Sequence, residues 1–397
     1  MTHRQSQIIS TERWNDRNAR ILVAPNSYKE SASSVKAAGV MVRELRRLGY
    51  ENITSLPLSD GGDGFLEVCV HQFGLQTLPF TIGNCYDGSP ASVTAGYDPS
   101  TKTSYVEAAD LIGLKLIPKE RRDPLRLNSR NFGEFLQMLT LTDFGIEKLV
   151  IGIGGTGITD LGLGLCGVFG LRLFDEEEKE LEIIPENYVK VHRLILPSRI
   201  HAKIDVVLDV ECALTGAMGM TKTFAPQKGA DEQAVAIIEA GVENILTVLK
   251  RDHQIDLRYH AIGAGGGIML GLSLLTDVRM NTSRTFVLNE LQASDALAHS
   301  DLVITGEGSF DRQSLMNKAA GIIVREARIQ GIPSLLIVGR ADRDMFAEDQ
   351  TAPAVFEMRS LFSSTKESIE NVSRGITAGI DEYFGSLPVI RRRGTEC

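Results

Sequence analysis

The stretch Asp301-Leu-Val-Ile-Thr-Gly-Glu-Gly-Ser-Phe-Asp-Arg-Gln-Ser314 decides the fold of this chain. A short run rich in β-branched residues ends in Thr305-Gly306-Glu307-Gly308, where two glycines allow the backbone to turn. Asp311 and Lys318 then enter a predicted helix, and a second apolar run follows at residues 335–338. This order predicts a strand–loop–helix–strand unit of an open parallel sheet.

Ligands of such sheets bind at the carboxyl ends of the strands. In this chain, that edge carries the charged side chains of Glu307, Asp311 and Lys318. Gly306 and Gly308 lie beside them, and a residue without a side chain lets a phosphate group approach the backbone closely. The stretch therefore predicts a site that handles phosphate.

Length and composition predict a two-domain α/β protein. At 397 residues the chain can build two separate cores, and apolar residues make up an ordinary 43% of it. Predicted strands alternate with predicted helices along most of the length, which is typical of α/β folds. The formal net charge of −9 argues against a nucleic-acid-binding protein and requires a local cationic pocket for any anionic substrate.

Cysteine usage and the N-terminal segment predict a cytoplasmic location. The first 19 residues are polar and charged and contain no apolar core of a signal peptide. The five cysteines form no CxxC pair and no cluster with histidine, so we expect reduced thiols rather than disulfides or a zinc site. They are Cys69, Cys85, Cys166, Cys212 and Cys397.

One segment, residues 149–174, is apolar enough to resemble a membrane span. It holds Asp160 near its centre and eight glycines, and both features are unfavourable in a membrane helix. A strand followed by a glycine-rich loop and a buried helix explains the same residues without these penalties. We therefore expect no membrane span.

The order of elements predicts one domain that is interrupted by another. Residues 21–25 and 53–58 are predicted buried strands, with a helix between them that begins near Ser31 or Ser33 and ends at Gly49. From Thr77 onward, short alternating runs separated by turns predict antiparallel strands of a second domain. The predicted parts are a flexible extension (1–19), a split Rossmann-like domain (20–76 plus 286–385), an inserted α/β domain (77–285) and a tail (386–397).

The segment Gly152-Ile-Gly-Gly-Thr-Gly157 matches the GxGxxG pattern, with Asp175 at roughly the spacing of a dinucleotide-binding fold. Taken alone, this pattern favours a nicotinamide-dependent oxidoreductase. Glycine-dense loops also match it by chance, and the following helix holds more glycine than the pattern requires. The alternative is a nest of backbone N–H groups at Gly154, Gly155 and Thr156 that binds an oxyanion or a phosphate.

Two other kinase signatures do not hold. Asp143-Phe144-Gly145 matches the magnesium-binding tripeptide of protein kinases, but the other protein-kinase motifs are missing from the sequence. The sequence also contains no GxxxxGK[ST] motif, so we do not expect a P-loop enzyme.

Acids and cations at other predicted strand ends suggest phosphoryl chemistry. Asp60-Gly-Gly-Asp63-Gly places two carboxylates in a glycine-rich loop, and Mg²⁺ prefers one or two carboxylates together with substrate phosphates. Lys29 lies in the loop that follows the first strand, and Asp209 ends the predicted strand that begins at Asp205. Ser129-Arg130 begins a predicted helix, where arginine could bind a substrate carboxylate.

A second glycine-rich loop, Gly263-Ala-Gly-Gly-Gly267, is a further candidate for anion binding, notably through Gly265 and Gly266. Glycine-rich turns, scattered acids and a few cations are together what phosphoryl transfer needs, because its catalysis is mostly positioning and charge stabilisation.

Taken in order, these residues resemble the bacterial glycerate kinase family, the type that yields 2-phosphoglycerate. The resemblance covers about residues 20–385. It implies the fold of that family, a Rossmann-like domain split by an inserted α/β domain, with the active site in the cleft between them. The blocks that carry it are Ala24-Pro-Asn-Ser-Tyr-Lys-Glu-Ser, Asp60-Gly-Gly-Asp-Gly, Arg122-Asp-Pro-Leu, Ser129-Arg, Ile151-Gly-Ile-Gly-Gly, Pro226-Gln-Lys-Gly, Gly263-Ala-Gly-Gly-Gly and Ile304-Thr-Gly-Glu-Gly…Asp311-Arg-Gln-Ser.

The resemblance implies phosphorylation of D-glycerate by ATP with Mg²⁺. Asp60 and Asp63 would hold the magnesium, and Asp209 or Asp311 would accept the hydroxyl proton. The cations implied are Lys29 and Lys318 near phosphate and Arg130, beside Ser129, on the glycerate carboxylate. The implied nucleotide- or phosphate-binding residues are Gly154, Gly155, Thr156, Gly265, Gly266, Gly306, Glu307 and Gly308.

This chain departs from the family pattern at several loop positions. Polar groups that would touch substrates are replaced, which leaves open a second interpretation: a catalytically reduced member that binds a metabolite in a regulatory role. The oligomeric state is not indicated by the sequence. The substituted positions are Asn26 for an acid, Thr159 and Cys212 for asparagines, Ser309 for an arginine and Asn317 for a glycine.

Overall fold

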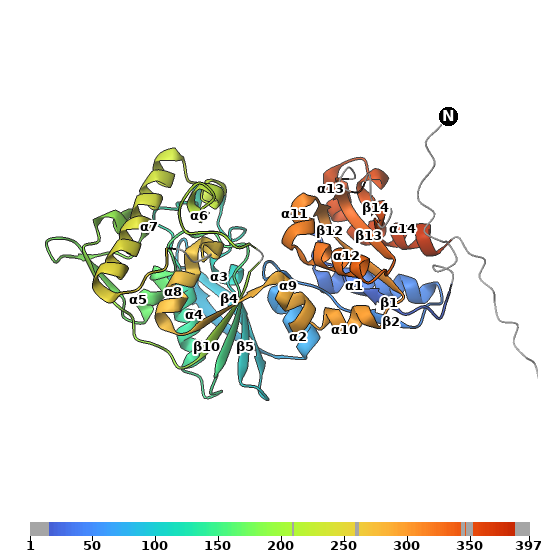
Figure 1. The fold of residues 1–397 in the computed structure, drawn as a ribbon, viewed down its shortest axis with the longest axis horizontal. Coiled ribbons are helices and arrows are strands. Elements are labelled where there is room, and N and C mark those ends of the chain that lie inside the picture. The colour runs from blue at the N-terminus through green and yellow to red at the C-terminus, as the bar shows by residue number, and fades with distance from the viewer. Residues whose placement is uncertain (1–15, 209, 259–261, 343–345, 347–351, 386–397) are drawn as a thin grey trace, which may run out of the picture. The chain divides into compact units, whose positions relative to one another are not determined.

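The computed structural model describes residues 16–208, 210–258, 262–342, 346 and 352–385. The chain forms two compact units (Figure 1), one made of Met1–Ser59 with Arg284–Cys397 and the other of Asp60–Ser283. We call them the split unit and the inserted unit. The predicted tail and most of the predicted N-terminal extension lie outside the described residues.

The boundary between the units differs from the predicted one. The sequence predicts that the split domain runs to residue 76, whereas the split unit ends at Ser59. The reason is that helix α2 (Phe65–Phe73) packs against strands β4 (Pro90–Asp98) and β5 (Thr103–Glu107) of the inserted unit. The helix belongs to the sheet that buries its apolar face.

The split unit is built on a five-stranded sheet in which every neighbouring pair is parallel. This confirms the predicted strand–loop–helix–strand unit and its parallel sheet. In spatial order the strands are β14 (Ala354–Glu357), β13 (Ser334–Ala341), β12 (Leu302–Phe310), β1 (Ile21–Val23) and β2 (Ile53–Ser55).

Helices cover both faces of this sheet, because successive side chains of a buried strand point to opposite sides. Leu335 and Ile337 of β13 pack with helices α1 (Ser34–Arg47) and α14 (Val372–Phe384), whereas Leu336 and Val338 pack with α12 (Ala319–Ile329). The other helices of this unit are α10 (Ala293–Ala298), α11 (Arg312–Asn317) and α13 (Thr365–Glu370), with α9 (Ser283–Thr285) at the unit boundary.

The inserted unit holds a six-stranded mixed sheet. The predicted antiparallel runs are confirmed, since β3 pairs with β4 and β4 with β5 in antiparallel fashion. Strand β5 then pairs with β6 in parallel, so it joins the two halves of the sheet. The spatial order is β11 (Val278–Thr282), β10 (Lys203–Leu208), β6 (Lys148–Gly152), β5, β4 and β3 (Gln76–Gly83).

The apolar segment 149–174 has the predicted non-membrane structure. It forms strand β6, a glycine-rich loop, the buried helix α5 (Leu163–Val168) and strand β7 (Arg172–Phe174). In the part of the chain that the structure describes, no helix has both the length and the apolar character needed to cross a membrane. The remaining helices of this unit are α3 (Ala109–Ile112), α4 (Arg130–Thr140), α6 (Met220–Phe224), α7 (Glu232–His253) and α8 (Ile268–Leu275).

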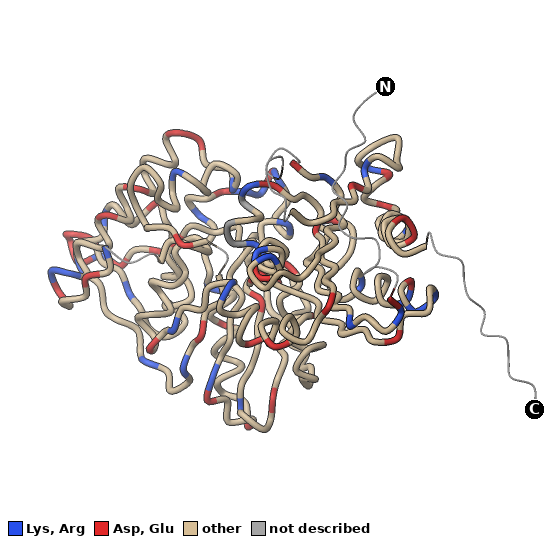
Figure 2. The backbone as a smooth tube through the Cα atoms, turned by 45° about the vertical axis from the view of Figure 1, so that its right-hand side comes forward, with Lys and Arg blue, Asp and Glu red and all other residues tan. Residues whose placement is uncertain are grey.

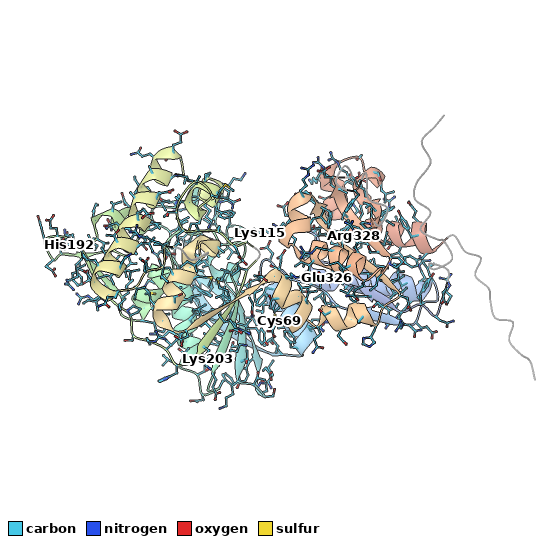
Figure 3. All side chains as sticks on the ribbon, in the orientation of Figure 1. Cys69, Lys115, His192, Lys203, Glu326 and Arg328 are labelled. Atoms are coloured by element: carbon cyan, nitrogen blue, oxygen red, sulfur yellow. The ribbon has the colours of Figure 1, made fainter. Side chains whose placement is uncertain are left out.

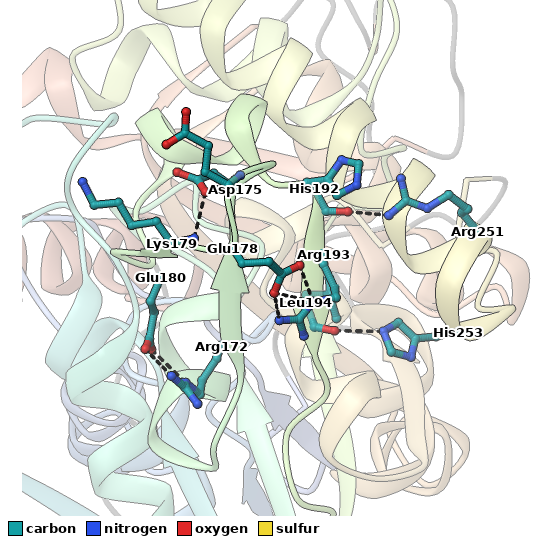
Figure 4. A network of polar contacts seen from close by, with 11 residues as sticks. Arg172, Asp175, Glu178, Lys179, Glu180, His192, Arg193, Leu194, Arg251 and His253 are labelled. Atoms are coloured by element: carbon teal, nitrogen blue, oxygen red, sulfur yellow. Dashed lines mark hydrogen bonds and ion pairs between the residues drawn. The ribbon is translucent and has the colours of Figure 1, made fainter.

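A small antiparallel sheet of β7, β8 (Glu180–Leu181) and β9 (Arg193–Ile195) carries a surface network of charges (Figure 4). Arg172 pairs with Glu180 and Arg193 with Glu178, and both guanidinium groups lie over the ring of Phe174. These contacts hold the hairpin together. Along the rest of the chain, charged residues of both signs are similarly interspersed (Figure 2).

Helix α7 begins at a side-chain cap whose removal has a measurable effect. The Asp231 carboxylate accepts the backbone N–H of Ala234 at 2.8 Å. We expect Asp231→Ala to lower the free energy of unfolding by about 1 kcal/mol, because the first turn of the helix loses its acceptor. Urea unfolding measures this change, and Asp231→Asn, which keeps an acceptor oxygen, should cost clearly less.

Candidate active-site loops

In the split unit, the loops after β1 and β12 lie against each other. The backbone N–H of Asn26 donates to the carbonyl of Gly306 at 2.8 Å, which extends the strand pairing into the loops. A Cβ atom on Gly306 would lie 2.0 Å from the Ile337 carbonyl oxygen and 2.3 Å from the Tyr28 hydroxyl. Only glycine fits this position, so Gly306 is required by backbone packing whatever else it does.

The acids and the cation predicted at this edge come together around Ser314. The Asp311 carboxylate caps helix α11 by accepting the N–H of Ser314 at 3.0 Å, and the Ser314 hydroxyl lies 3.3 Å from Lys318 Nζ. Lys318 Nζ is also 3.9 Å from the Glu307 carboxylate. Glu307, Asp311 and Lys318 therefore lie in one local cluster.

This cluster is partly open to solvent. Lys318 keeps 28% of its side chain exposed, whereas Glu307 keeps only 5%. Burial and, to a lesser degree, the Glu307 charge raise the pKa of Tyr28, whose hydroxyl donates to the Ile337 carbonyl at 2.7 Å. Lys29 is exposed, and its backbone nitrogen would lie 3.4 Å from a Cβ on Gly308. The edge thus presents two lysines beside a nearly buried carboxylate.

In the inserted unit, three loops from distant parts of the sequence meet. The N–H of Gly154 donates to the Gly61 carbonyl at 2.9 Å, and a Cβ on Gly154 would lie 2.5 Å from Gly62 Cα. Gly61 itself has φ of +90° and packs against the Val207 carbonyl at the end of β10. Gly154, which the sequence predicts as an anion-binding residue, is thus needed for the close approach of these loops.

The Asp60–Gly64 loop lies in an acidic environment. Glu107 accepts the N–H groups of Gly64 at 3.0 Å and Leu66 at 3.1 Å. Burial raises the pKa of Glu107 to about 8, and the nearby carboxylates of Asp110 and Asp63 contribute to this rise by repulsion. The carboxyl groups of Asp63, Glu107 and Asp110 therefore lie close enough for their charges to repel one another.

Lys115 is a site residue that sequence reasoning missed. It is labelled in Figure 3, and its ammonium group pairs with the Asp63 carboxylate. The N–H of the preceding Leu114 donates to the Gly155 carbonyl at 2.8 Å, which places Lys115 beside the glycine loop after β6. The contact with Asp63 spans 52 positions in the sequence, so no local pattern could indicate it.

The donor chemistry of this loop fits magnesium. Asp60 and Asp63 are both half-buried, and carboxylate oxygens are the ligands that Mg²⁺ prefers. Among the residues with described positions, no group of three or more His, Cys, Asp or Glu side chains is arranged to hold a metal ion. Substrate phosphates would therefore have to supply further ligands, as is usual for Mg²⁺ in phosphoryl-transfer enzymes.

Ser129 and Arg130 lie in different environments. The Ser129 side chain is fully buried, donates its hydroxyl to the Asp160 carboxylate at 2.7 Å and accepts the N–H of Leu165 at 3.0 Å. Its hydroxyl therefore serves the packing of helix α4 against the loop before α5. Arg130 is exposed and pairs with Glu134 at 3.2 Å.

Asp160 is the centre of a buried polar network. It accepts hydrogen bonds from the N–H and hydroxyl of Ser129 and from the N–H groups of Gly162 and Gly164. Complete burial still raises its pKa, with these donors acting in the opposite direction. Beside it, Thr159 is buried and donates to the Pro124 carbonyl at 2.9 Å, so the residue that replaces the family's asparagine has a packing role.

The loop before helix α8 has an unusual backbone. Gly265, Gly266 and Gly267 all have positive φ, between +62° and +77°. A Cβ on Gly266 would lie 2.0 Å from the Ile158 carbonyl oxygen. Gly265 packs against Ile153, in the loop that follows β6. Thr156 belongs to the same loop and is buried. The structure thus brings the loop of Gly265 and Gly266 against the loop after β6.

Lys228 is the second cation that sequence reasoning missed. It lies in the Pro226-Gln-Lys-Gly block and is 3% exposed. Its Nζ donates to the Ile158 carbonyl at 2.6 Å, and burial lowers its pKa from 10.5 to about 8. Its proximity to the Gly266 loop could not be read from the sequence, because it depends on contacts across 70 positions.

Two of the predicted positions lie outside the described part of the chain, namely Asp209 and the side chain of Asn317. Of the remaining substituted positions, Asn26 is buried and accepts the N–H of Ser27 at 2.8 Å, Cys212 is half-buried and Ser309 is exposed.

Asp175, the acidic residue on which the dinucleotide-binding interpretation depends, has a structural role in a turn. The Asp175 carboxylate accepts the N–H groups of Glu177 at 3.0 Å and Lys179 at 2.9 Å (Figure 4). It therefore stabilises the turn between β7 and β8. The glycine pattern is also separated from helix α5, which begins at Leu163, whereas the dinucleotide fingerprint opens directly into a helix.

Comparisons with known proteins agree on one family. The model of the Glycerate kinase family matches residues 21–384. A glycerate kinase of Haemophilus influenzae is 30% identical over 366 residues, which cover 89% of this chain and 96% of the relative. A glycerate 2-kinase of Escherichia coli is 28% identical over 375 residues, covering 90% of this chain and 97% of that protein.

The fold agrees with the same family. The crystal structure of a protein assigned as glycerate kinase 2 from Salmonella typhimurium LT2 superposes with a TM-score of 0.74 at 26% identity. The superposition covers 93% of this chain and 99% of that chain. The resemblance drawn from the loop motifs is confirmed over nearly the whole length, and this chain belongs to the glycerate kinase family.

Proposed function

We propose that this protein transfers the γ-phosphoryl group of ATP to D-glycerate and forms 2-phosphoglycerate. Family membership and the names of the relatives from H. influenzae and E. coli support the reaction. The observation that carries the proposal is the cluster of Lys318, Ser314, Asp311 and Glu307 at the carboxyl edge of a parallel sheet. This edge is where such sheets bind ligands.

Two lysines at this edge of the split unit, Lys29 and Lys318, have the chemistry that phosphate requires. Lys318 and the exposed Lys29 would offset the negative charge of the triphosphate, and the absence of a side chain at Gly308 leaves the backbone accessible. Glu307 and Ser314 hold the Lys318 ammonium in place, at 3.9 and 3.3 Å. A fixed cation stabilises transition-state charge without reorganising during the reaction.

The acid that accepts the hydroxyl proton is Asp311 or Asp209. Asp311 is held by its contact with the Ser314 N–H, which restricts its side chain and orients the carboxylate for that role. Asp60 and Asp63 would hold Mg²⁺, which supplies charge neutralisation at the phosphate oxygens. Lys115, paired with Asp63, would keep that carboxylate oriented toward the glycine loop.

The first test is a coupled assay that measures ADP release with D-glycerate and ATP–Mg²⁺. We expect saturable turnover of the wild type, with phosphate on the C2 hydroxyl of the product by ³¹P–¹H correlation. Binding of D-glycerate without any ADP release would instead favour the regulatory interpretation. ADP release without D-glycerate dependence would contradict the proposed substrate.

Lys318 is the sharpest single probe of this proposal. We expect Lys318→Met to lower kcat/KM by at least about 100-fold, because one fixed cation is lost from the transition state. Lys318→Arg should recover part of that loss, since charge is kept but its position shifts. Lys366→Met, at an exposed lysine of α13, is the matched control and should leave kcat/KM unchanged. Equal activity of Lys318→Met and the control would remove Lys318 from the mechanism.

A further inference from the structure

Lys228 is a buried cation with very little compensation. It follows the short helix α6, and its side chain is almost entirely removed from solvent. Among the described residues, its only side-chain hydrogen bond is the one from Nζ to the Ile158 carbonyl, at 2.6 Å. No described carboxylate lies within 4.0 Å of it, although Asp160 is close enough to favour its charged form. An ammonium has three donors, so this group is far from satisfied.

A charge in this condition is unfavourable for folding. Moving an ammonium from water into protein is costly unless it is paired and hydrogen-bonded, and a single carbonyl does not provide that. The lowered pKa of Lys228 reports the same cost. The Asp160 carboxylate already accepts hydrogen bonds from Ser129, Gly162 and Gly164, so Lys228 is not needed as a hydrogen-bond donor to it.

The position of Lys228 indicates what its charge could bind. The Ile158 carbonyl that it contacts is also the group against which the Gly266 backbone packs. The Gly263 N–H in turn donates to the Cys212 carbonyl at 2.8 Å. These residues follow β6, precede α8 and follow β10, so Lys228 lies where loops at the carboxyl edge of the inserted sheet converge. Ligands of open parallel sheets bind at this edge.

We propose that Lys228 is the cation of the inserted unit that binds an anionic oxygen group of a substrate, either the carboxylate of the hydroxy acid or a phosphate of ATP. This inference rests on the proposed function and deepens it. The sequence resemblance assigned the carboxylate to Arg130, but Arg130 is exposed and paired with Glu134. Lys228 has donors left over, and a bound anion would supply the acceptors that the described residues do not.

Two substitutions separate a role of the charge from a role of the hydrogen bond. Lys228→Met removes both, with little change in side-chain volume. Lys228→Gln keeps an N–H donor for the Ile158 carbonyl but removes the charge. Lys222→Met is the matched control, because Lys222 is on the neighbouring helix α6 but exposed, with Glu239 at 3.4 Å. Cooperative thermal unfolding of each variant establishes that it folds.

The experiment is isothermal titration of the full chain with D-glycerate, ATP–Mg²⁺ and inorganic phosphate separately, together with the ADP-release assay. We expect both Lys228 variants to weaken one arm at least about 10-fold, while Lys222→Met changes none. Weakening of the D-glycerate arm identifies the carboxylate, and weakening of the ATP and phosphate arms identifies a phosphate.

The outcomes also separate this inference from the proposed function. If the wild type binds an anion through Lys228 but releases no ADP with D-glycerate, the proposed reaction fails and the inference stands. If the wild type turns over D-glycerate and both Lys228 variants bind every ligand as the wild type does, the inference is wrong. Recovery of binding by Lys228→Gln alone, or failure of the wild type to bind any of the three anions, also overturns it.

Discussion

Gly266→Ala is expected to lower the free energy of unfolding by roughly 2–5 kcal/mol, the sum of two effects. The position has φ of +72°, and a residue with a Cβ is destabilised by about 1–2 kcal/mol in that conformation. The new Cβ would also lie 2.0 Å from the Ile158 carbonyl oxygen, and overpacking of this kind costs about 1–3 kcal/mol. The contact is with backbone, so no change of rotamer relieves it. Urea unfolding at neutral pH measures the loss.

Two other glycines provide the controls. Gly170 has φ of +96°, and a Cβ added there would have no atom within 4 Å, so Gly170→Ala isolates the conformational cost at about 1–2 kcal/mol. Gly39 lies inside helix α1 with free space around it, and Gly39→Ala should stabilise by about 0.5–1 kcal/mol. If Gly266→Ala costs no more than Gly170→Ala, the close approach of the two loops is wrong.

The parts of the fold that could be predicted have local signals. The β-branched run of β12, its two glycines and the helix cap at Asp311 stand within one short stretch, and each feature has a meaning that does not depend on distant residues. The same holds for the turns between the antiparallel strands β3, β4 and β5. The order of the loop motifs indicated the family, and the family model confirms it.

What could not be predicted depends on long-range burial. The sequence around Ser129 predicts a polar helix start. In the structure its hydroxyl is buried and donates a hydrogen bond to Asp160, which lies 31 positions later in the sequence. Lys115 has no distinguishing neighbours in sequence, and the Pro226-Gln-Lys-Gly block does not show that Lys228 is buried. The contacts of the two lysines with Asp63 and Ile158 form only in the folded chain. The unit boundary moved for the same reason, since the sheet that buries α2 cannot be identified from the helix alone.

The cost of the Lys228 charge should appear as a dependence of stability on pH. Its pKa is about 8 in the folded protein and 10.5 as the ordinary value, so the folded state binds fewer protons than the unfolded state between these values. The free energy of unfolding therefore rises as pH increases from about 8 to 10.5. Over this range the unfolded chain gradually loses its charge on Lys228, so folding no longer has to bury or remove that charge. At about 1.4 kcal/mol per pKa unit, the contribution is about 3 kcal/mol.

The measurement compares Lys228→Met with the wild type by urea unfolding at pH 7 and pH 10. We expect Lys228→Met to gain stability relative to the wild type at pH 7. The difference in the free energy of unfolding, variant minus wild type, should be about 2–3 kcal/mol larger at pH 7 than at pH 10. Among the residues with described positions, the titratable groups that act on Lys228 are Asp160 and Cys212. Thiols ionise in the same pH range, so both proteins also carry Cys212→Ser. A difference that stays constant with pH would mean that contacts already in the protein compensate the ammonium, and the argument for a bound anion would lose its physical basis.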